Sequence, residues 1–466
     1  MTTESARTYW CELAWLGGDG VEAGVVVEVE GGRISRVEPG APARPPGAER
    51  LAGLTVPGFA NAHSHAFHRA LRGRTEAGRG SFWSWRAAMY ELAAALDPEN
   101  YHALARATFA EMALAGITAV GEFHYLHHGP GGTPYDDPNE IGRALIAAAA
   151  EAGIRITLLD ACYLHGGFGD ELGPEQLRFG DGSADAWARR VEALGELGPG
   201  ARAGAAIHSV RAVDPDSAAS VAARARERSW PLHAHLSEQP AENEACLAVH
   251  GRTPTALLDD AGALSDRFTA VHFTHVSERD LGLLGGVGGH CCLCPTTERD
   301  LADGVADARA IADAGARLAL GSDSHAVIDP LEEMRALELD QRLVTGERGH
   351  HAAAELLRAA CGGGHAAIGW PEAGRVEPGA IADLVTVGLD GVRLAGAGSE
   401  HALEAIVFAA TAADVRSVIA SGRPVVNEGT HVGMDVAAEL RDAIGALDGD
   451  LLPDSGNKAP IGGDRA

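Results

Sequence analysis

The sequence predicts an α/β protein made of a (β/α)₈ TIM barrel and a small β-sandwich domain. Two observations carry this prediction. A short apolar strand followed by a helical segment recurs eight times over about 310 residues. Strand-like segments also precede and follow this series, and we expect them to pair in the small domain. The alternative that fits the same alternation is a doubly wound sheet.

The predicted strands of the small domain lie at both ends of the chain. Near the N-terminus, Ala23–Val29 is apolar and β-branched, Gly31–Gly32 is a turn signal, and Ile34–Val37 resumes the strand. Val376–Gly388 and Val415–Val432 have the same character. The predicted organisation is therefore residues 1–55 and 371–452 in the small domain, including a helix over 436–447, with the barrel in 56–370 and a disordered tail at 453–466.

The predicted barrel strands are continuous apolar runs, which are typical of a parallel sheet buried on both faces. Ala-rich helical stretches such as Tyr101–Ala115, Asn139–Ala152 and Asp216–Arg228 separate them. The eight strands are Val56–His65, Thr118–His124, Ile154–Cys162, Ala201–Ser209, Pro231–Glu238, Phe268–His275, Gly288–Pro295 and Arg317–Ser324.

Composition excludes several classes of function. The 466 residues carry a formal net charge of −27, so we expect no nucleic-acid partner and no anionic membrane surface as partner. The only lysine is Lys458, which excludes a Schiff-base enzyme and a P-loop ATPase. The seven cysteines are an odd number, and neither a signal segment nor a long apolar run is present, so we expect a reduced, cytoplasmic protein.

Histidines gather at the C-terminal ends of the predicted strands, where a barrel carries its catalytic site. His63 and His65 are two residues apart on a strand, so both imidazoles face one point. The same spacing leaves a choice between His233 and His235. Asp323 ends the eighth strand, where a helix N-cap is the alternative role. The polar residues at these ends are His63, His65, His124, His208, His235, His272, His275 and Asp323.

Three imidazoles and one carboxylate suit Zn²⁺ with a position left for water, although Fe²⁺ and Mn²⁺ accept similar ligands. Some binuclear metallohydrolases of this architecture bridge two ions with a carboxylated lysine. Because the predicted barrel contains no lysine, we expect one ion per subunit. The cysteines of the segment HCCLCP, residues 290–295, are expected to pack in the barrel core instead.

The HxH pair, the strand-five His with Glu238 three residues on, the strand-six His and the strand-eight Asp together resemble the amidohydrolase superfamily. Val56–Phe59 and Ala380–Val385 add to this resemblance, which covers essentially the whole chain. More narrowly, the segments SFWSWRAAMY, EFHYLHH and HSVRAV are similar to those of the formimidoylglutamate deiminases, enzymes of histidine degradation. They occupy Ser81–Tyr90, Glu122–His128 and His208–Val213.

The resemblance implies hydrolysis of N-formimino-L-glutamate, a dicarboxylate, to N-formyl-L-glutamate and ammonia. It implies His272 and Glu238 as acid and base, with Asp323 also orienting the water. His68 stands where this family is expected to carry Gln, which changes one substrate contact. The implied metal ligands are His63, His65, His235 and Asp323, and the implied substrate-binding residues are His68, Arg86, Tyr125, His208, Arg211 and Glu238.

Two other functions fit parts of the sequence. One is a deaminase of the same superfamily that acts on a guanine- or adenosine-like ring, which would need aromatic stacking rather than paired arginines. The other is a non-catalytic barrel scaffold, which would be expected to have lost ligands. We further expect a homodimer, as for many enzymes of this size. The acidic run Glu332–Glu338 is expected to be a solvated helix face.

Overall fold

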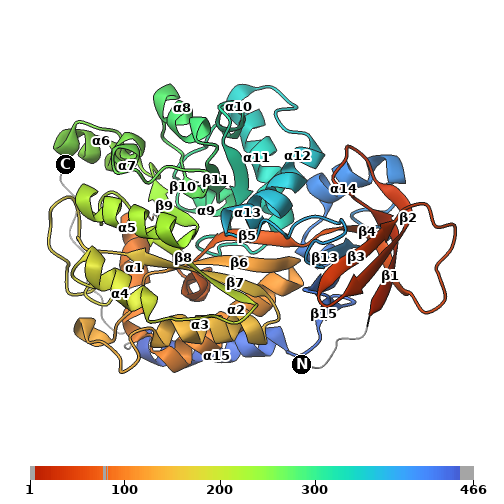
Figure 1. Cartoon of the computed structure of the whole chain (residues 1–466), viewed down its shortest axis with the longest axis horizontal. Coiled ribbons are helices and arrows are strands. Elements are labelled where there is room, and N and C mark those ends of the chain that lie inside the picture. The colour runs from red at the N-terminus through yellow and green to blue at the C-terminus, as the bar shows by residue number, and fades with distance from the viewer. Residues whose placement is uncertain (1–5, 77–79, 81, 452–466) are drawn as a thin grey trace.

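A computed structural model describes residues 6–76, 80 and 82–451 of the chain, and the predicted disordered tail at 453–466 lies outside the described residues. Two β-sheets organise the molecule: a barrel surrounded by helices, and a second sheet at one side of it (Figure 1). Among the described residues, no helix combines the length and apolar character needed to cross a membrane.

The barrel consists of eight strands that pair in parallel in the order of the chain, which confirms the predicted fold class and excludes a doubly wound sheet. A parallel bridge between Ser64 and Asp323 brings the first and last strands together. The strands are β5 (Phe59–Ser64), β6 (Ile117–His124), β7 (Arg155–Cys162), β8 (Ala201–Ile207), β9 (Leu232–Leu236), β10 (Phe268–His272), β11 (His290–Leu293) and β12 (Arg317–Leu320).

The helices around the barrel begin at clear sequence signals. In α2, the Asp97 side chain accepts hydrogen bonds from the backbone N–H groups of Glu99 and Asn100, and Pro98 occupies the first turn. The helices are α1 (Phe82–Ala95), α2 (Pro98–Leu114), α3 (Glu140–Glu151), α4 (Ala184–Glu192), α5 (Pro215–Arg228), α6 (Pro240–His250), α7 (Pro254–Asp260), α8 (Glu278–Gly286), α9 (Pro295–Asp300), α10 (Ala308–Asp313), α11 (Pro330–Thr345), α12 (Ala353–Arg358) and α13 (Gly364–Ala367).

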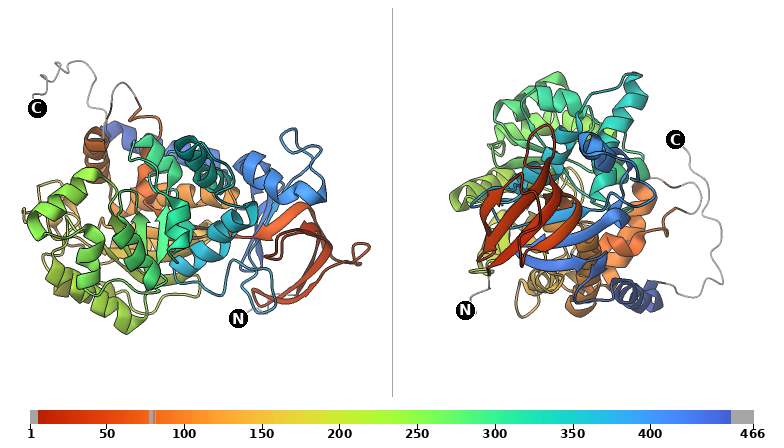
Figure 2. Two further views of the ribbon diagram at one scale, coloured as in Figure 1. Left: turned by 90° about the horizontal axis from the view of Figure 1, so that it is seen from above. Right: turned by 90° about the vertical axis from the view of Figure 1, so that its right-hand side faces the viewer.

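The second sheet joins the two ends of the chain, because β4 pairs antiparallel with β13 (Figure 2). Two of its strands, β1 and β4, were not among the predicted strands of the small domain, and the last residues of β4, Val56 and Pro57, were expected to begin the first barrel strand. The strand order is β16-β15-β14-β13-β4-β1-β2-β3. The bounds are β1 (Arg7–Ala14), β2 (Glu22–Glu30), β3 (Arg33–Glu38), β4 (Glu49–Pro57), β13 (Leu384–Val387), β14 (Val415–Ala420), β15 (Arg423–Asn427) and β16 (Thr430–His431), with helices α14 (Ala402–Ala409) and α15 (Val436–Leu451).

A buried ion pair connects the second sheet to the N-terminal end of the barrel. Arg155, the first residue of β7, donates two hydrogen bonds to the carboxylate of Asp383, at 2.5 and 2.8 Å. The Asp383 carboxylate also accepts from the backbone N–H of Ser421 at 2.8 Å. Nearby, the Arg202 guanidinium stacks on the ring of Trp370, 3.8 Å from its centroid. These contacts lie at the N-terminal end of the barrel, opposite the strand ends where the sequence predicts the site.

The expectation for the acidic run of α11 is wrong for two of its carboxylates. Glu333 and Glu338 are buried, at 2% and 0% exposure. Glu333 accepts hydrogen bonds from the backbone N–H and the hydroxyl of Thr296. Glu338 accepts from the backbone N–H groups of Gly349 and His351, both at 2.7 Å. The run is therefore partly interior, because backbone donors of neighbouring loops replace water around these carboxylates.

Candidate active site

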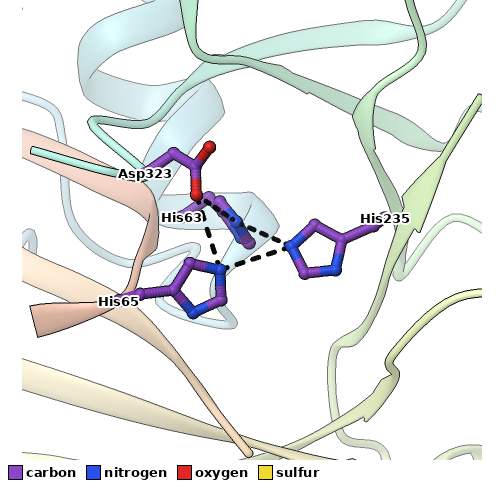
Figure 3. Close-up of side chains that lie close together, drawn as sticks. All are labelled: His63, His65, His235 and Asp323. Carbon is purple, nitrogen blue, oxygen red and sulfur yellow. Dashed lines mark hydrogen bonds and ion pairs between the residues drawn. The ribbon is translucent and has the colours of Figure 1, made fainter. Parts of the chain in front are cut away.

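Four side chains meet at the C-terminal ends of three barrel strands (Figure 3). His63 lies near the end of β5 and His65 directly follows it, while His235 lies in β9 and Asp323 follows β12. His235 Nε2 is 3.2 Å from His63 Nε2 and 3.3 Å from His65 Nε2. Asp323 Oδ1 is 3.3 Å from His63 Nε2 and 3.4 Å from His65 Nε2. All four residues are buried.

The protonation of these rings follows from their other nitrogens. His65 Nδ1 is 2.9 Å from the carbonyl oxygen of Phe123, and His235 Nδ1 is 2.9 Å from that of His208. Since a carbonyl only accepts, each Nδ1 carries the proton and each Nε2 presents a lone pair to the centre. Burial lowers the pKa of His63, His65 and His235, which keeps the imidazoles neutral.

This donor set fits a divalent metal ion. The Nε2 lone pairs of His65 and His235 face the Nε2 of His63 and a carboxylate oxygen of Asp323, and three imidazoles with one carboxylate are a donor set that suits a cation in their midst. Bonds of about 2.0–2.1 Å to a tetrahedral zinc ion imply about 3.3–3.4 Å between neighbouring ligand atoms. The separations between the ligand atoms match that spacing. The predicted ligand set is therefore assembled in the fold.

His272 and Glu238, the predicted acid and base, lie beside the four predicted ligand residues. His272 Nε2 is 3.7 Å from Glu238 Oε1 and 3.9 Å from Asp323 Oδ2, while its Nδ1 is 3.4 Å from Glu298 Oε1. Burial opposes the charged imidazolium, but these carboxylates outweigh it and raise the pKa of His272 well above its usual range. Burial also raises the pKa of Glu238. Both groups can therefore carry a proton inside the site.

The backbone is strained where the strands end at this site. Ser237, His272, Phe273, Asp323 and His325 all have positive φ angles, from 41° to 69°. Such angles are costly for residues other than glycine and persist only where the surroundings enforce them. Their concentration at the ends of β9, β10 and β12 turns Asp323 and His272 inward, toward a common point.

The pocket above these residues contains most of the predicted substrate contacts. The His68 ring is 3.0 Å from the Tyr125 hydroxyl, through its Nε2. Arg211 Nε is 3.8 Å from Glu242 Oε1, and Arg86 reaches in from α1. The predicted residues that line the pocket are His65, His68, Arg86, Tyr125, His208, Arg211, His235, Glu238, His272 and Asp323.

Other histidines of the strand ends lie outside this group. His233 Nε2 bonds the carbonyl of Ala367, so the choice between the strand-five histidines falls on His235. His275 Nε2 bonds the carbonyl of Asp303. A second cluster contains His124, His127 and Asp160. Its carboxylate is already held by two hydrogen bonds from Arg190, a fixed cation that disfavours a metal ion there.

Two buried carboxylates support the site, and sequence reasoning did not find them. Glu122 accepts hydrogen bonds from the Ser64 hydroxyl at 2.5 Å and the Ala66 N–H at 2.7 Å, one on each side of His65. Burial raises the pKa of Glu122 to about 8. Glu298 also accepts from the backbone N–H of Cys294 at 2.8 Å, on the strand end beside His272. The available signal was an acidic residue within or just after an apolar strand.

Known proteins share this fold and much of this sequence. The model of the Amidohydrolase family matches residues 54–425. A formimidoylglutamate deiminase of Pseudomonas aeruginosa is 38% identical over 87% of this chain and 92% of its own length. The crystal structure of an amidohydrolase from Brucella melitensis has a TM-score of 0.87 and 35% identity, covering 95% of this chain and 99% of its own.

A second solved structure carries a metal ion. The crystal structure of an adenosine deaminase from Xanthomonas campestris, with bound zinc, has a TM-score of 0.82 and 25% identity. It covers 95% of this chain and 98% of its own. The family model, the relative from Pseudomonas aeruginosa and the two solved structures each match most of this chain. This chain belongs to the amidohydrolase family.

Proposed function

We propose that this protein is a metal-dependent hydrolase of linear amidines that converts N-formimino-L-glutamate and water to N-formyl-L-glutamate and ammonia. The observation that carries the proposal is the placement of two arginines, Arg86 and Arg211, in the pocket above a three-histidine, one-carboxylate ligand set. The 38% identity to a formimidoylglutamate deiminase supports the same substrate. A role in histidine breakdown follows from this substrate.

The chemistry begins with water beside His63, His65, His235 and Asp323, the residues that would hold the ion. A divalent ion held there would lower the pKa of that water toward about 7. Asp323 would accept a proton from this water as the water oxygen bonds to the formimino carbon, and His272, whose Nε2 is 3.9 Å from Asp323 Oδ2, would orient the water. Glu238 would protonate the imino nitrogen, and the proton taken from water would then pass to the same nitrogen. As the carbon–nitrogen bond breaks, the new hydroxyl would return its proton to the Glu238 carboxylate, which forms the formyl carbonyl and releases ammonia.

The arginines would hold the two carboxylates of the substrate. A guanidinium offers a planar fork of donors that matches a carboxylate, and it stays charged at any working pH. Tyr125, His68 and His208 add polar groups to the same pocket. The protein as a whole is strongly acidic, so these local cations, rather than the global field, would secure a dianionic substrate.

An ammonia-release assay tests the proposal. The zinc-loaded enzyme is given N-formimino-L-glutamate, N-formimino-L-aspartate, guanine and adenosine at equal concentrations. We expect the highest kcat/KM with N-formimino-L-glutamate. Turnover of guanine or adenosine alone would overturn the proposed substrate, and no turnover of any compound by metal-loaded protein would support the non-catalytic scaffold.

A specific observation keeps ring deamination as the second candidate. The rings of Trp85, Tyr90 and Phe179 line the pocket, so aromatic stacking is available beside the arginines. The adenosine deaminase from Xanthomonas campestris shares the fold. A neutral ring would leave the partly buried guanidinium groups of the pocket without an anion, and we therefore rank this candidate second.

Metal identity and assembly are part of the proposal. We propose one Zn²⁺ per subunit, with Fe²⁺ or Mn²⁺ as the competing ions, and metal analysis of protein purified without chelator decides among them. We also propose a homodimer, which light scattering coupled to gel filtration would detect. A cytoplasmic location is proposed because all seven cysteines are free and buried.

A further inference from the structure

A buried glutamine stands behind the pocket and contacts two of its tyrosines. Gln176 lies between β7 and α4 and is 4% exposed, and it does not line the pocket itself. Its Nε2 donates to the hydroxyl of Tyr163 at 2.8 Å and to that of Tyr90 at 3.1 Å. Both phenol rings face the pocket, one from α1 and the other from the residue after β7.

The orientation of the Gln176 amide is fixed by the backbone. Its Oε1 accepts a hydrogen bond from the N–H of Gly173 at 2.9 Å, and an N–H group can only donate. The NH₂ end of the amide must therefore point at the tyrosines. Further backbone bonds from Gln176 N–H to Gly173 and from Phe179 N–H to Gln176 hold this turn in place. Each phenol oxygen thus accepts one N–H hydrogen bond from Gln176, on the side that faces away from the pocket.

A second set of donors lies on the same wall of the pocket. The Arg86 guanidinium lines the pocket together with Tyr90 and Tyr163, and it lies 5.1 Å from the centroid of the Tyr90 ring. Arg86 and Tyr90 are four residues apart on α1, so they share one helix face. A guanidinium carries no acceptor, so these contacts add only donors to the cluster.

The cluster therefore holds more donor hydrogens than lone pairs. The amide of Gln176 donates to both phenol oxygens, and the guanidinium of Arg86 and the two phenol O–H groups add further donors, while the only acceptors among these groups are the lone pairs of the two phenol oxygens. Even a hydrogen bond between Tyr90 and Tyr163 would use one O–H and also one lone pair, so it would not remove the excess. The surplus donors need an acceptor from the pocket, and an anion is the acceptor that satisfies several donors at once.

We infer that Tyr90 and Tyr163, together with Arg86, form the subsite for one carboxylate of the substrate, and that Gln176 is its positioning residue. Gln176 occupies the rear lone pair of each phenol and so directs the O–H protons into the pocket. This inference rests on the proposed function for the identity of the substrate. It assigns to Tyr90 and Tyr163 a binding role through their hydroxyls, beyond the packing of their rings.

The experiment combines kinetics with N-formimino-L-glutamate and calorimetry with glutarate on the metal-loaded enzyme. Gln176→Met is expected to raise KM and to weaken glutarate binding about tenfold, with kcat changed less than about threefold. Gln176→Glu should have the larger effect, about a hundredfold, because a carboxylate accepts the phenol protons and turns them away from the pocket. Tyr90→Phe and Tyr163→Phe delete the hydroxyls and keep the rings, so each should also weaken glutarate binding.

Two variants serve as matched controls. Gln341→Met changes another buried glutamine, on α11, and Tyr9→Phe removes a buried hydroxyl in the second sheet. Both should leave KM and glutarate affinity unchanged, and every variant should keep its metal content. Values of KM and glutarate affinity within about twofold of the parent in all four cluster variants would overturn the inference, as would a fall in kcat at constant KM.

The same experiment separates this inference from the proposed function. If the parent enzyme releases no ammonia from N-formimino-L-glutamate, the proposed function fails, and glutarate calorimetry alone then decides the subsite. Loss of glutarate affinity in the Gln176 and tyrosine variants supports the subsite in that case. A parent enzyme that does not bind glutarate overturns it.

Discussion

The two ends of the barrel are built by the same eight strands, yet they treat polar groups in opposite ways. At the N-terminal end, Arg155 and Asp383 pair in the interior and the Arg202 guanidinium stacks on Trp370. At the C-terminal end, the Nε2 atoms of His63 and His235 lie 3.2 Å apart. The polar groups of the first end are paired within the protein, whereas ring nitrogens at the second end are placed to bind a ligand.

This difference shows where stability and function are located. Paired charges at the N-terminal end hold the second sheet against the barrel, so changes there should affect unfolding and leave chemistry intact. Unmatched donors and acceptors at the C-terminal end cost folding energy and make binding favourable. Each of the following variants changes one end of the barrel, and the measurements show whether stability, catalysis or both are affected.

The largest expected effect is on turnover. Glu238→Gln keeps the shape of the side chain but removes the proton that Glu238 delivers, so kcat should fall by about 10²–10⁴. The four ligand residues are untouched, so metal content and melting temperature should stay at the parent values. Steady-state kinetics and metal analysis measure both. An unchanged kcat would refute the acid role of Glu238.

At the opposite end, Asp383→Ala should destabilise the protein and spare catalysis. It leaves the Arg155 guanidinium buried without a counter-charge, a change that costs about 3–5 kcal/mol of unfolding free energy. Glu38→Ala removes an exposed partner of Arg36 and serves as the control, with an expected cost below about 1 kcal/mol. Denaturant unfolding gives the free energies, and kcat of the folded enzyme should be equal in both.

The pocket arginines should affect substrate binding alone. Arg86→Met and Arg211→Met each remove a charged hydrogen-bond donor, so KM should rise about ten- to a hundredfold, which corresponds to about 1.5–3 kcal/mol. Metal content should not change, since neither residue is among the ligands. Arg416→Met, at a surface pair with Asp390, is the matched control. If all three variants had the same KM, Arg86 and Arg211 would not be the residues that bind the substrate carboxylates.

The smallest effect concerns acid stability. Burial raises the pKa of Asp383, but the Arg155 guanidinium outweighs it and holds that pKa below its usual range. The stabilisation is therefore complete above the unfolded pKa of about 3.9 and is lost as pH falls toward the folded pKa, with a slope of at most about 1.4 kcal/mol per pH unit. The stability difference between parent and Asp383→Asn should shrink over this range. Melting curves between pH 3 and 7 measure it.

The arrangement of the barrel followed from the sequence because strand period and strand-end chemistry are local. All eight barrel strands overlap their predicted ranges, and the HxH spacing alone placed His63 and His65 on one side. The choice of His235 over His233 was not local. That choice depended on a hydrogen bond between the His233 ring and the backbone carbonyl of Ala367, which lies 134 residues further along the chain.

The sequence did not reveal which buried polar side chains find hydrogen-bond partners in distant segments of the chain. Glu333 and Glu338 looked like a solvated face because their interior partners lie in other segments. Glu122 and Gln176 were overlooked for the same reason, since each acts on residues distant in the chain. The strand β1 was missed because its tryptophan, cysteine and glutamate do not alternate as a simple strand pattern.

The bridge between Ser64 and Asp323 has a consequence for how the protein matures. These residues lie at the candidate metal centre, and they are also the seam at which the first strand meets the last. A chain emerging from the ribosome carries His63 and His65 long before Asp323 exists, so an unfinished barrel holds only part of the predicted ligand set. Activity that needs this set would therefore arrive only with ring closure, and its appearance would report that the barrel has closed.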